Sequence, residues 1–228
     1  MGVTVSLACR LGHKLLFDHV DRRYWHKVQE RRSKRRLQSL EPDRLFEHRP
    51  EQAIPPDWYD LEFLYRTVRR RRPRLIFEFG SGCSSVILAR ALLDNAETGA
   101  EGRLTSFESD PYWADATRAG LKGPLATVAE VVTAPPIKAE YAGTPVWRYS
   151  GVPADAAPDL VLLDGPKLTA ERFAAVDVLD MEERLPAGFF LIVDGRSDNC
   201  LFLEQHFRRN YRKRWNRVRK NTSYELVG

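Results

Sequence analysis

The sequence predicts an α/β fold with a doubly wound, mostly parallel seven-stranded sheet, a C-terminal antiparallel hairpin and an N-terminal helical arm. Two observations predict it. From about residue 57 onwards, short apolar runs alternate with helical segments, which is typical of a parallel sheet covered on both faces. Four of these runs also end in an acidic residue, at the edge where doubly wound sheets bind ligands.

The chain divides into a predicted basic helical arm, residues 1–50, and a predicted α/β domain, residues 51–228. Within residues 15–40, Leu16, Val20, Tyr24 and Val28 follow one another at four-residue spacing among arginines and lysines, which is typical of an amphipathic helix. Prolines after residue 41 end the pattern. Such an arm can pack on the domain, mediate dimerisation or contact a membrane surface through residues 10–36, and the sequence does not choose between these.

The elements of the domain follow in order. A helix begins after Asp57, whose side chain can accept from the free amides of the first turn. Another begins after Asp110, because Pro111 suits a first helical position. The predicted strands occupy residues 74–79, 103–109, 125–134, 159–165, 188–195, 211–218 and 222–228. The other predicted helices occupy residues 84–94, 169–185 and 199–207.

The composition is that of a globular protein, with 43% hydrophobic and 29% charged residues. We see no apolar run near the roughly 18 residues that span a bilayer, and no signal-peptide pattern. Cys9, Cys83 and Cys200 are odd in number and far apart, which does not fit a disulfide framework. We therefore expect a cytoplasmic protein.

The net charge is +5, and the basic residues cluster in residues 31–36, 69–72 and 208–220. Such clusters can bind nucleic acid, an anionic membrane or an acidic substrate. A solvated basic surface is the simpler interpretation. Nucleic acid is therefore a partner that the sequence permits but does not favour.

The stretch FEFGSGCSS, residues 77–85, joins a strand to a helix. Gly80 and Gly82 permit a tight turn and a close approach of ligand to backbone. A dinucleotide-binding turn would have a third glycine where Ser85 stands. Glu78 disfavours a nearby pyrophosphate but suits a ligand with an ammonium group. S-adenosylmethionine (SAM) has an amino group and a sulfonium, and it lacks phosphate.

Several motifs resemble those of class I SAM-dependent methyltransferases. They are FEFGSGCSS, LTSFESD, PDLVLLDGP and GFFLIVDGR, followed by the terminal hairpin. The resemblance covers roughly residues 57–228. Within the family, the sequence is most similar to an uncharacterised bacterial-type group with EFGSG, LDGP and VDGR motifs. It implies a Rossmann-like methyltransferase fold, with SAM as cofactor. The cofactor-binding residues that it implies are Glu78, Gly80, Ser81, Gly82, Glu108 and Ser109.

Glu108 is implied as the ribose ligand, since a carboxylate can accept from two vicinal hydroxyls at once. Relatives often carry an acidic residue after the third strand that meets the adenine amino group. Here Ala134 and Pro135 stand in that stretch, so adenine recognition must come from elsewhere.

Asp164, at the end of the fourth strand, is the candidate catalytic residue that contacts or deprotonates the methyl acceptor. It could instead cap its own turn. Catechol-type O-methyltransferases hold magnesium with two aspartates and an asparagine, which raises Asp164, Asp194 and Asn199 as metal ligands. In that group the asparagine directly follows the second aspartate, whereas Gly195 does so here. We therefore assign no metal.

These observations favour methyl transfer from SAM to a hydroxyl or similar nucleophile of a small molecule or glycan. If the protein is an enzyme, the alternative function is methylation of RNA. If it is not an enzyme, the alternative is a non-catalytic module that binds nucleic acid or a membrane through its basic segments. The acceptor pocket is expected to involve residues 135–158, where Tyr141, Trp147 and Tyr149 either stack on a ring or cover the sheet edge. The oligomeric state is open.

Overall fold

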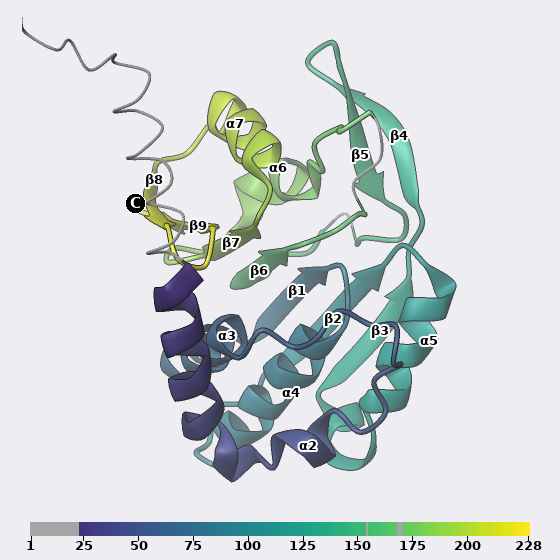
Figure 1. The fold of residues 1–228 in the computed structure, drawn as a ribbon. Helices are drawn as coiled ribbons and strands as arrows, with labels where there is room; N and C mark the ends of the chain where they lie inside the picture. Colours follow the sequence, from purple (N-terminus) through teal and green to yellow (C-terminus); the bar gives the residue numbers. More distant parts are fainter. Residues whose placement is uncertain (1–22, 154, 168–170) are drawn as a thin grey trace, which may run out of the picture.

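The computed structural model describes residues 23–153, 155–167 and 171–228, which build a seven-stranded sheet (Figure 1). Its strands are β1 (Leu75–Phe79), β2 (Arg103–Glu108), β3 (Ala129–Thr133), β6 (Leu160–Leu163), β7 (Phe190–Asp194), β8 (Tyr211–Asn216) and β9 (Asn221–Leu226). Their order is β3-β2-β1-β6-β7-β9-β8. The first five are parallel, whereas β9 pairs antiparallel with both of its neighbours, β7 and β8. This confirms the predicted sheet and its terminal hairpin.

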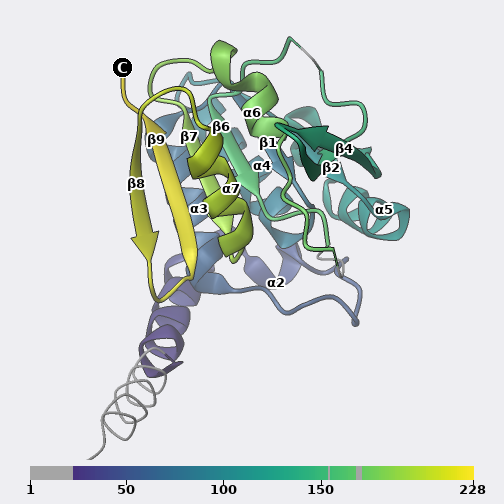
Figure 2. The same cartoon turned by 90° about the horizontal axis from the view of Figure 1, so that it is seen from above.

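Helices cover both faces of the sheet (Figures 1 and 2). One face carries α3 (Trp58–Arg71), α4 (Cys83–Ala96) and α5 (Pro111–Gly120), and the other carries α6 (Asp177–Met181) and α7 (Ser197–His206). Each face of the sheet has its own hydrophobic core, and successive strand side chains point to opposite faces. Ile76 thus packs with the side chains of α3 and α4, and Phe77 with those of α6 and α7. No helix among the described residues is long and apolar enough to cross a bilayer.

Short elements complete the chain. They are η1 (Gln38–Leu40), α2 (Pro42–Leu45), η2 (Gly123–Thr127) and η3 (Glu182–Arg184). A second sheet of β4 (Pro136–Tyr141) and β5 (Thr144–Tyr149) stands on the same face as α6 and α7.

The N-terminal segment packs on the domain. Residues 23–36 are helical, and Leu37 and Leu40 are buried with side chains of α3 and α4. Glu62 of α3 accepts from the Ser33 hydroxyl at 2.6 Å, which fixes this helix against the core. Residues before 23, including part of the predicted arm and of the proposed membrane-contacting segment 10–36, lie outside the described residues.

The predicted helix caps are confirmed. The Asp57 carboxylate accepts from the amides of Tyr59 and Asp60 at the start of α3. The Asp110 carboxylate accepts from the amide of Tyr112 at the start of α5. Both side chains replace a hydrogen bond that the first helical turn lacks.

Two predicted elements differ from the structure. The helix expected over residues 169–185 begins only at Asp177, because the chain before it pairs with β5: Trp147 N donates to Ala174 O at 2.8 Å and Val176 N donates to Trp147 O at 3.1 Å. The strand expected over residues 125–134 begins at Ala129, since the preceding residues form η2.

The hairpin of β4 and β5 falls where the sequence suggested only a pocket-shaping stretch. Ala142 and Gly143 form its two-residue turn, with φ values of 49° and 78°. A turn with two positive φ values matches the twist of antiparallel strands. The hairpin thus places Tyr149 at its end, close to the carboxyl edge of the main sheet.

If the N-terminal segment is part of the folded core, Leu37→Ala should destabilise the whole domain. The side chain is 2% exposed, so its truncation should lower the free energy of unfolding by about 2–4 kcal/mol. Equilibrium urea unfolding measures this, with Arg35→Ala, an exposed neighbour, as the control. Equal stability of the two variants would contradict the packing described above.

Candidate functional site

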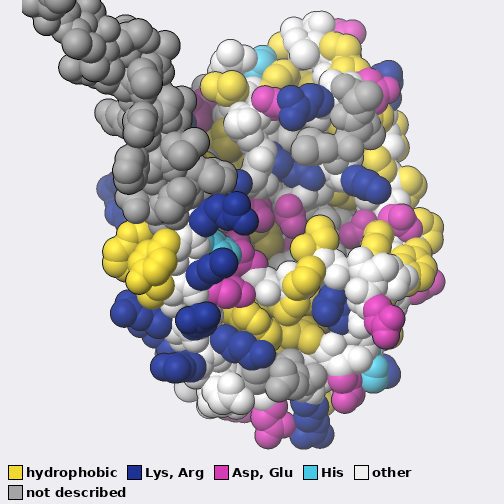
Figure 3. Space-filling model, viewed as in Figure 1, with side chains coloured by type: hydrophobic (Ala, Val, Ile, Leu, Met, Phe, Trp, Pro, Cys, Tyr) yellow, Lys and Arg dark blue, Asp and Glu magenta, His cyan; other side chains and the backbone are white. Residues whose placement is uncertain are grey.

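A cavity of about 650 Å³ opens at the carboxyl ends of β1 and β6, where the strand order reverses. Its lining comes from the glycine-rich turn, the end of β2, the start of α5, the ends of β6 and β7, and residues 45–57. Figure 3 shows acidic side chains gathered in the hollow near the middle of this face. A volume of this order is typical of small-molecule sites, which measure roughly 300–1,000 Å³.

The backbone of Gly80 lies against that of Gly165. A Cβ atom on Gly80 would lie 3.0 Å from the Gly165 nitrogen, and Gly80 has a φ of 95°. Only glycine adopts this conformation without strain. Both Asp164 N and Gly165 N donate to the carbonyl of Phe79, which ties the end of β6 to the end of β1. The two turns therefore form one continuous floor beneath the cavity.

Glu78 lies beneath this floor and does not line the cavity. The side chain is fully buried, and its Oε2 accepts from the hydroxyls of Ser85 and Ser106, each at 2.5 Å. Ser85 Oγ also accepts from Gly82 N, so Glu78 holds the glycine-rich turn through a serine. Burial raises the pKa of Glu78 to about 7, although the serine hydroxyls oppose this shift.

Glu108 lines the cavity beside the glycine-rich turn. One carboxylate oxygen accepts from Ser81 N at 2.7 Å, and the other accepts from Asp110 N and the Ser109 hydroxyl, both at 3.1 Å. The Ser81 hydroxyl lies 3.0 Å from that of Thr117 on α5. The carboxylate is thus held in place by three donors from two turns.

Asp164 and Asp194 line the cavity at the ends of β6 and β7. Surrounding protein atoms raise the pKa of Asp164, as does the charge of Glu108, whereas Arg196 lowers it. Burial, together with Asp164 and Asp57, raises the pKa of Asp194 to about 7. The Asp194 carboxyl can therefore take up or release a proton close to neutral pH, and the pKa of Asp164 is shifted in the same direction.

Arg196 does not neutralise these aspartates through a direct bond between side chains. Its guanidinium donates to the main-chain carbonyls of Asp164 and Pro166, and the distance from Nε to the Asp164 oxygen is 2.8 Å. It therefore holds the turn that carries Asp164. The Gly165–Pro166 peptide in this turn is cis.

The structure separates Asn199 from the two aspartates that the sequence grouped with it. Asn199 is 2% exposed, its amide donates to Ala175 O at 2.9 Å, and it does not line the cavity. Asp164 and Asp194 do lie at one end of the cavity. The asparagine member of the suggested magnesium set thus has a structural role on α7.

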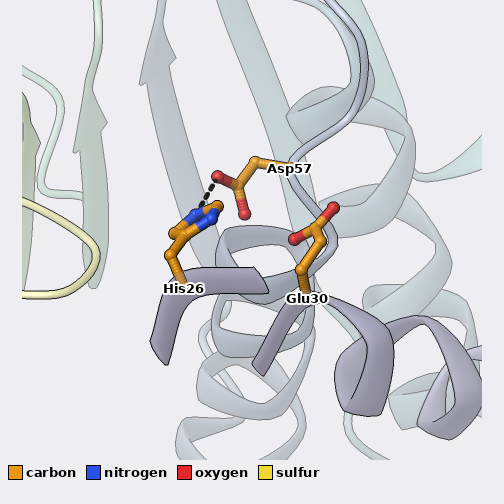
Figure 4. Close-up of side chains that lie close together, drawn as sticks. All are labelled: His26, Glu30 and Asp57. Carbon is orange, nitrogen blue, oxygen red and sulfur yellow. Dashed lines mark hydrogen bonds and ion pairs between the residues drawn. The ribbon is translucent and has the colours of Figure 1, made fainter. Parts of the chain in front are cut away.

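His26, Glu30 and Asp57 form a second group of potential metal ligands (Figure 4), of which only Asp57 lines the cavity. His26 Nε2 lies 2.7 Å from Asp57 Oδ2, and the two Glu30 oxygens accept from the amides of Trp58 and Tyr59. All four carboxylate oxygens have N–H partners. The group therefore fastens the helix of residues 23–36 to the N-terminus of α3.

Asp60, one turn into α3, adds another carboxylate to the cavity wall. Burial and the charges of Asp57 and Asp194 raise its pKa to about 8, against the effect of Arg219. The Arg219 guanidinium lies over the ring of Tyr59, 3.7 Å from its centroid. Its Nε also lies 3.6 Å from Asp60 Oδ1, so Arg219 partly balances the charge of this carboxylate.

Tyr149 reaches the floor of the cavity from the end of β5. It is 4% exposed, and its hydroxyl has no hydrogen-bond partner among the residues that the structure describes. A Cβ atom on Gly165 would lie 1.9 Å from this hydroxyl. Gly165 is thus the residue that leaves room for Tyr149.

The backbone amide of Ala134, in the stretch where the sequence lacks an acidic residue, donates to Glu108 O at 2.7 Å and is not free to bind a ligand. The wall next to Glu108 is formed instead by α5, which contributes Trp113, Ala116 and Thr117. The indole of Trp113 offers an aromatic surface of the kind on which a base can stack.

Six of the seven predicted site residues line one cavity. They are Gly80, Ser81, Gly82, Glu108, Ser109 and Asp164. The sequence did not identify the wall formed by residues 45–57, nor Asp60 and Trp113. Prolines around residue 55 and the cap at Asp57 were visible, but they indicate a bend and a helix start rather than a site.

No protein-family model matches the chain, and no curated protein sequence matches it. Solved structures do. An O-methyltransferase from Bacillus cereus in complex with SAH (S-adenosylhomocysteine) has a TM-score of 0.55 at 15% identity, over 91% of this chain and 100% of that one. The SAH-bound Podospora anserina methyltransferase PaMTH1 has a TM-score of 0.56 at 16% identity, over 82% and 89%. The O-methyltransferase TomG from Streptomyces achromogenes, in complex with SAM, has a TM-score of 0.50 at 18% identity, over 82% and 86%. The chain thus has the Rossmann-like methyltransferase fold.

The buried carboxyl group of Glu78 should make stability depend on pH. Its pKa is about 7 in the folded protein and 4.5 in a model compound, so the folded state keeps a proton that the unfolded state loses. Stability from this group is therefore lost as pH rises through this interval. As the pH rises from 5 to 8, the free energy of unfolding of Glu78→Gln, measured in urea, should increase by on the order of 1–3 kcal/mol relative to that of the wild type. Parallel pH profiles would contradict this, and Glu101→Gln, at an exposed site, is the control.

Proposed function

We propose that the protein is a SAM-dependent methyltransferase that acts on a hydroxyl or similar nucleophile of a small molecule or glycan. The observation that carries the proposal is the meeting of the glycine-rich turn and the Glu108 carboxylate in one cavity at the switch point of the sheet. O-Methyltransferases bound to SAM or SAH are among the proteins with this fold, which supports the same cofactor.

The charge of the cavity supports SAM over a dinucleotide. Glu108, Asp110, Asp164 and Asp194 all line it, and a pyrophosphate among these carboxylates would meet strong repulsion. SAM carries an ammonium and a sulfonium group instead. Glu108 would hold the ribose hydroxyls, and the backbone of Gly80, Ser81 and Gly82 would pack against the methionine part.

When bound, SAM supplies a methyl group that its sulfonium already activates. The protein must then align the acceptor and, for a hydroxyl, take up its proton. Asp164 opens onto the cavity, and its pKa is raised, which makes its carboxylate a stronger base than an ordinary aspartate. Leu45 and Phe46, which are partly buried, form an apolar wall on the side where the acceptor would bind.

The finer parts of the proposal rest on the sequence. The three separate cysteines indicate a cytoplasmic location, and the EFGSG, LDGP and VDGR motifs indicate kinship with a bacterial-type group of methyltransferases. We assign no resident metal, since Asn199 does not line the cavity that Asp164 and Asp194 share.

Glu108→Ala should weaken SAH binding roughly ten- to a hundredfold, because hydrogen bonds to a charged group contribute about 1.5–3 kcal/mol. Calorimetric titration with SAH, beside NAD, measures this. Glu101→Ala removes an exposed carboxylate outside the cavity and should bind as wild type does. Binding of NAD instead of SAH by the wild-type protein would overturn the cofactor assignment.

Asp164→Asn should lower methyl transfer by roughly 10²- to 10⁴-fold, the usual contribution of a general base, and leave SAH affinity within about threefold. Transfer of label from methyl-labelled SAM into a fractionated small-molecule extract measures the rate. Full activity of the variant would remove Asp164 from the reaction. Labelling of an RNA fraction instead would assign the RNA alternative.

A further inference from the structure

We propose that Tyr149 forms part of a subsite for the amino-acid end of the cofactor, and that its hydroxyl hydrogen-bonds to the ammonium or carboxylate group there. The inference rests on the proposed function and deepens it. It adds to the site a residue from the β4–β5 hairpin, outside all of the glycine-rich and acidic motifs.

The first support is the unsatisfied hydroxyl itself. Tyr149 is 4% exposed, and within the described part of the chain its Oη has no hydrogen-bond partner. A buried polar atom without a partner lowers stability, so native proteins rarely keep one without a reason. Since Tyr149 lines the cavity, a bound ligand can supply the missing partner.

The second support is the position of the hydroxyl. The point where a Cβ of Gly165 would stand lies 1.9 Å from Tyr149 Oη and 2.9 Å from Gly80 N. The hydroxyl therefore lies where the turns after β1 and β6 touch. Its ring packs against Phe79, with centroids 5.2 Å apart, which fixes its direction.

The third support is the direction in which the ligand must extend. With its ribose at Glu108, the base and the amino-acid end leave in opposite directions. On one side α5 offers the indole of Trp113, which suits a base. On the other side lie Gly80, Gly165 and the Tyr149 hydroxyl, which suit the polar end.

The hydroxyl is suited to either charged group of an amino acid. Burial, followed by the charge of Glu108, raises the pKa of Tyr149 far above its usual range, so the phenol keeps its proton. A neutral hydroxyl can accept from an ammonium and donate to a carboxylate. The excess of carboxylates nearby adds a preference for the ammonium.

The test compares two ligands and two tyrosines by calorimetric titration. SAH carries the amino-acid end, whereas 5′-deoxy-5′-methylthioadenosine carries the same nucleoside without it. Tyr149→Phe should weaken SAH binding roughly tenfold and leave methylthioadenosine binding within about twofold. Tyr141→Phe is the matched control on β4, because its ring packs on Phe202 and His206 rather than in the cavity.

Stability of the ligand-free protein gives a second readout. If the hydroxyl awaits a ligand, Tyr149→Phe should raise the Tm, because it removes an unpaired buried group. A purely structural hydroxyl would lower it on removal. The inference is overturned if Tyr149→Phe binds SAH as wild type does, or loses affinity for both ligands equally. If the wild-type protein binds neither ligand, the cofactor assignment itself fails.

Discussion

The site depends on the contact between the backbones of Gly80 and Gly165. Because the turns after β1 and β6 touch, neither position has room for a side chain, and the two strand ends are held in register through the carbonyl of Phe79. Asp164 follows β6, whose end this contact fixes, and Gly80 N also donates to Phe107 O, which ties the end of β2, and with it Glu108, to the same turn. A doubly wound sheet creates a crevice at its switch point in general. Here two glycines determine its depth.

The carboxyl groups around this contact oppose the stability of the fold. Glu78, Asp60 and Asp194 all have raised pKa values, because burial and mutual repulsion disfavour their charged forms. The apolar cores on the two faces of the sheet offset this. Concentrating acids at one end of the strands is therefore a structural liability, and such groups are often found where a protein binds a ligand.

Much of the fold followed from the sequence, because strand and helix periodicity and the caps at Asp57 and Asp110 are local signals. The gathering of Gly80, Glu108 and Asp164 around one cavity also followed, since parallel strands bring their carboxyl ends to one edge. The rest depended on contacts between distant segments. The pairing of Ala174 and Val176 with β5 replaced a predicted helix turn, and no local pattern reveals a partner strand. Likewise, Glu78 was expected at the ligand but lies below the turn, because two serines lie close enough to bind it.

Two kinds of segment line the cavity. The ends of β1, β2, β6 and β7 are held in place by the sheet, whereas residues 46–57 connect two helices and pair with no strand. The two sides can therefore diverge separately in evolution. Insertions or exchanges in residues 45–57 can alter which molecules fit without disturbing the glycine-rich turn. Under the proposed function, such changes would alter the acceptor while the glycine-rich turn and Glu108 stay as they are.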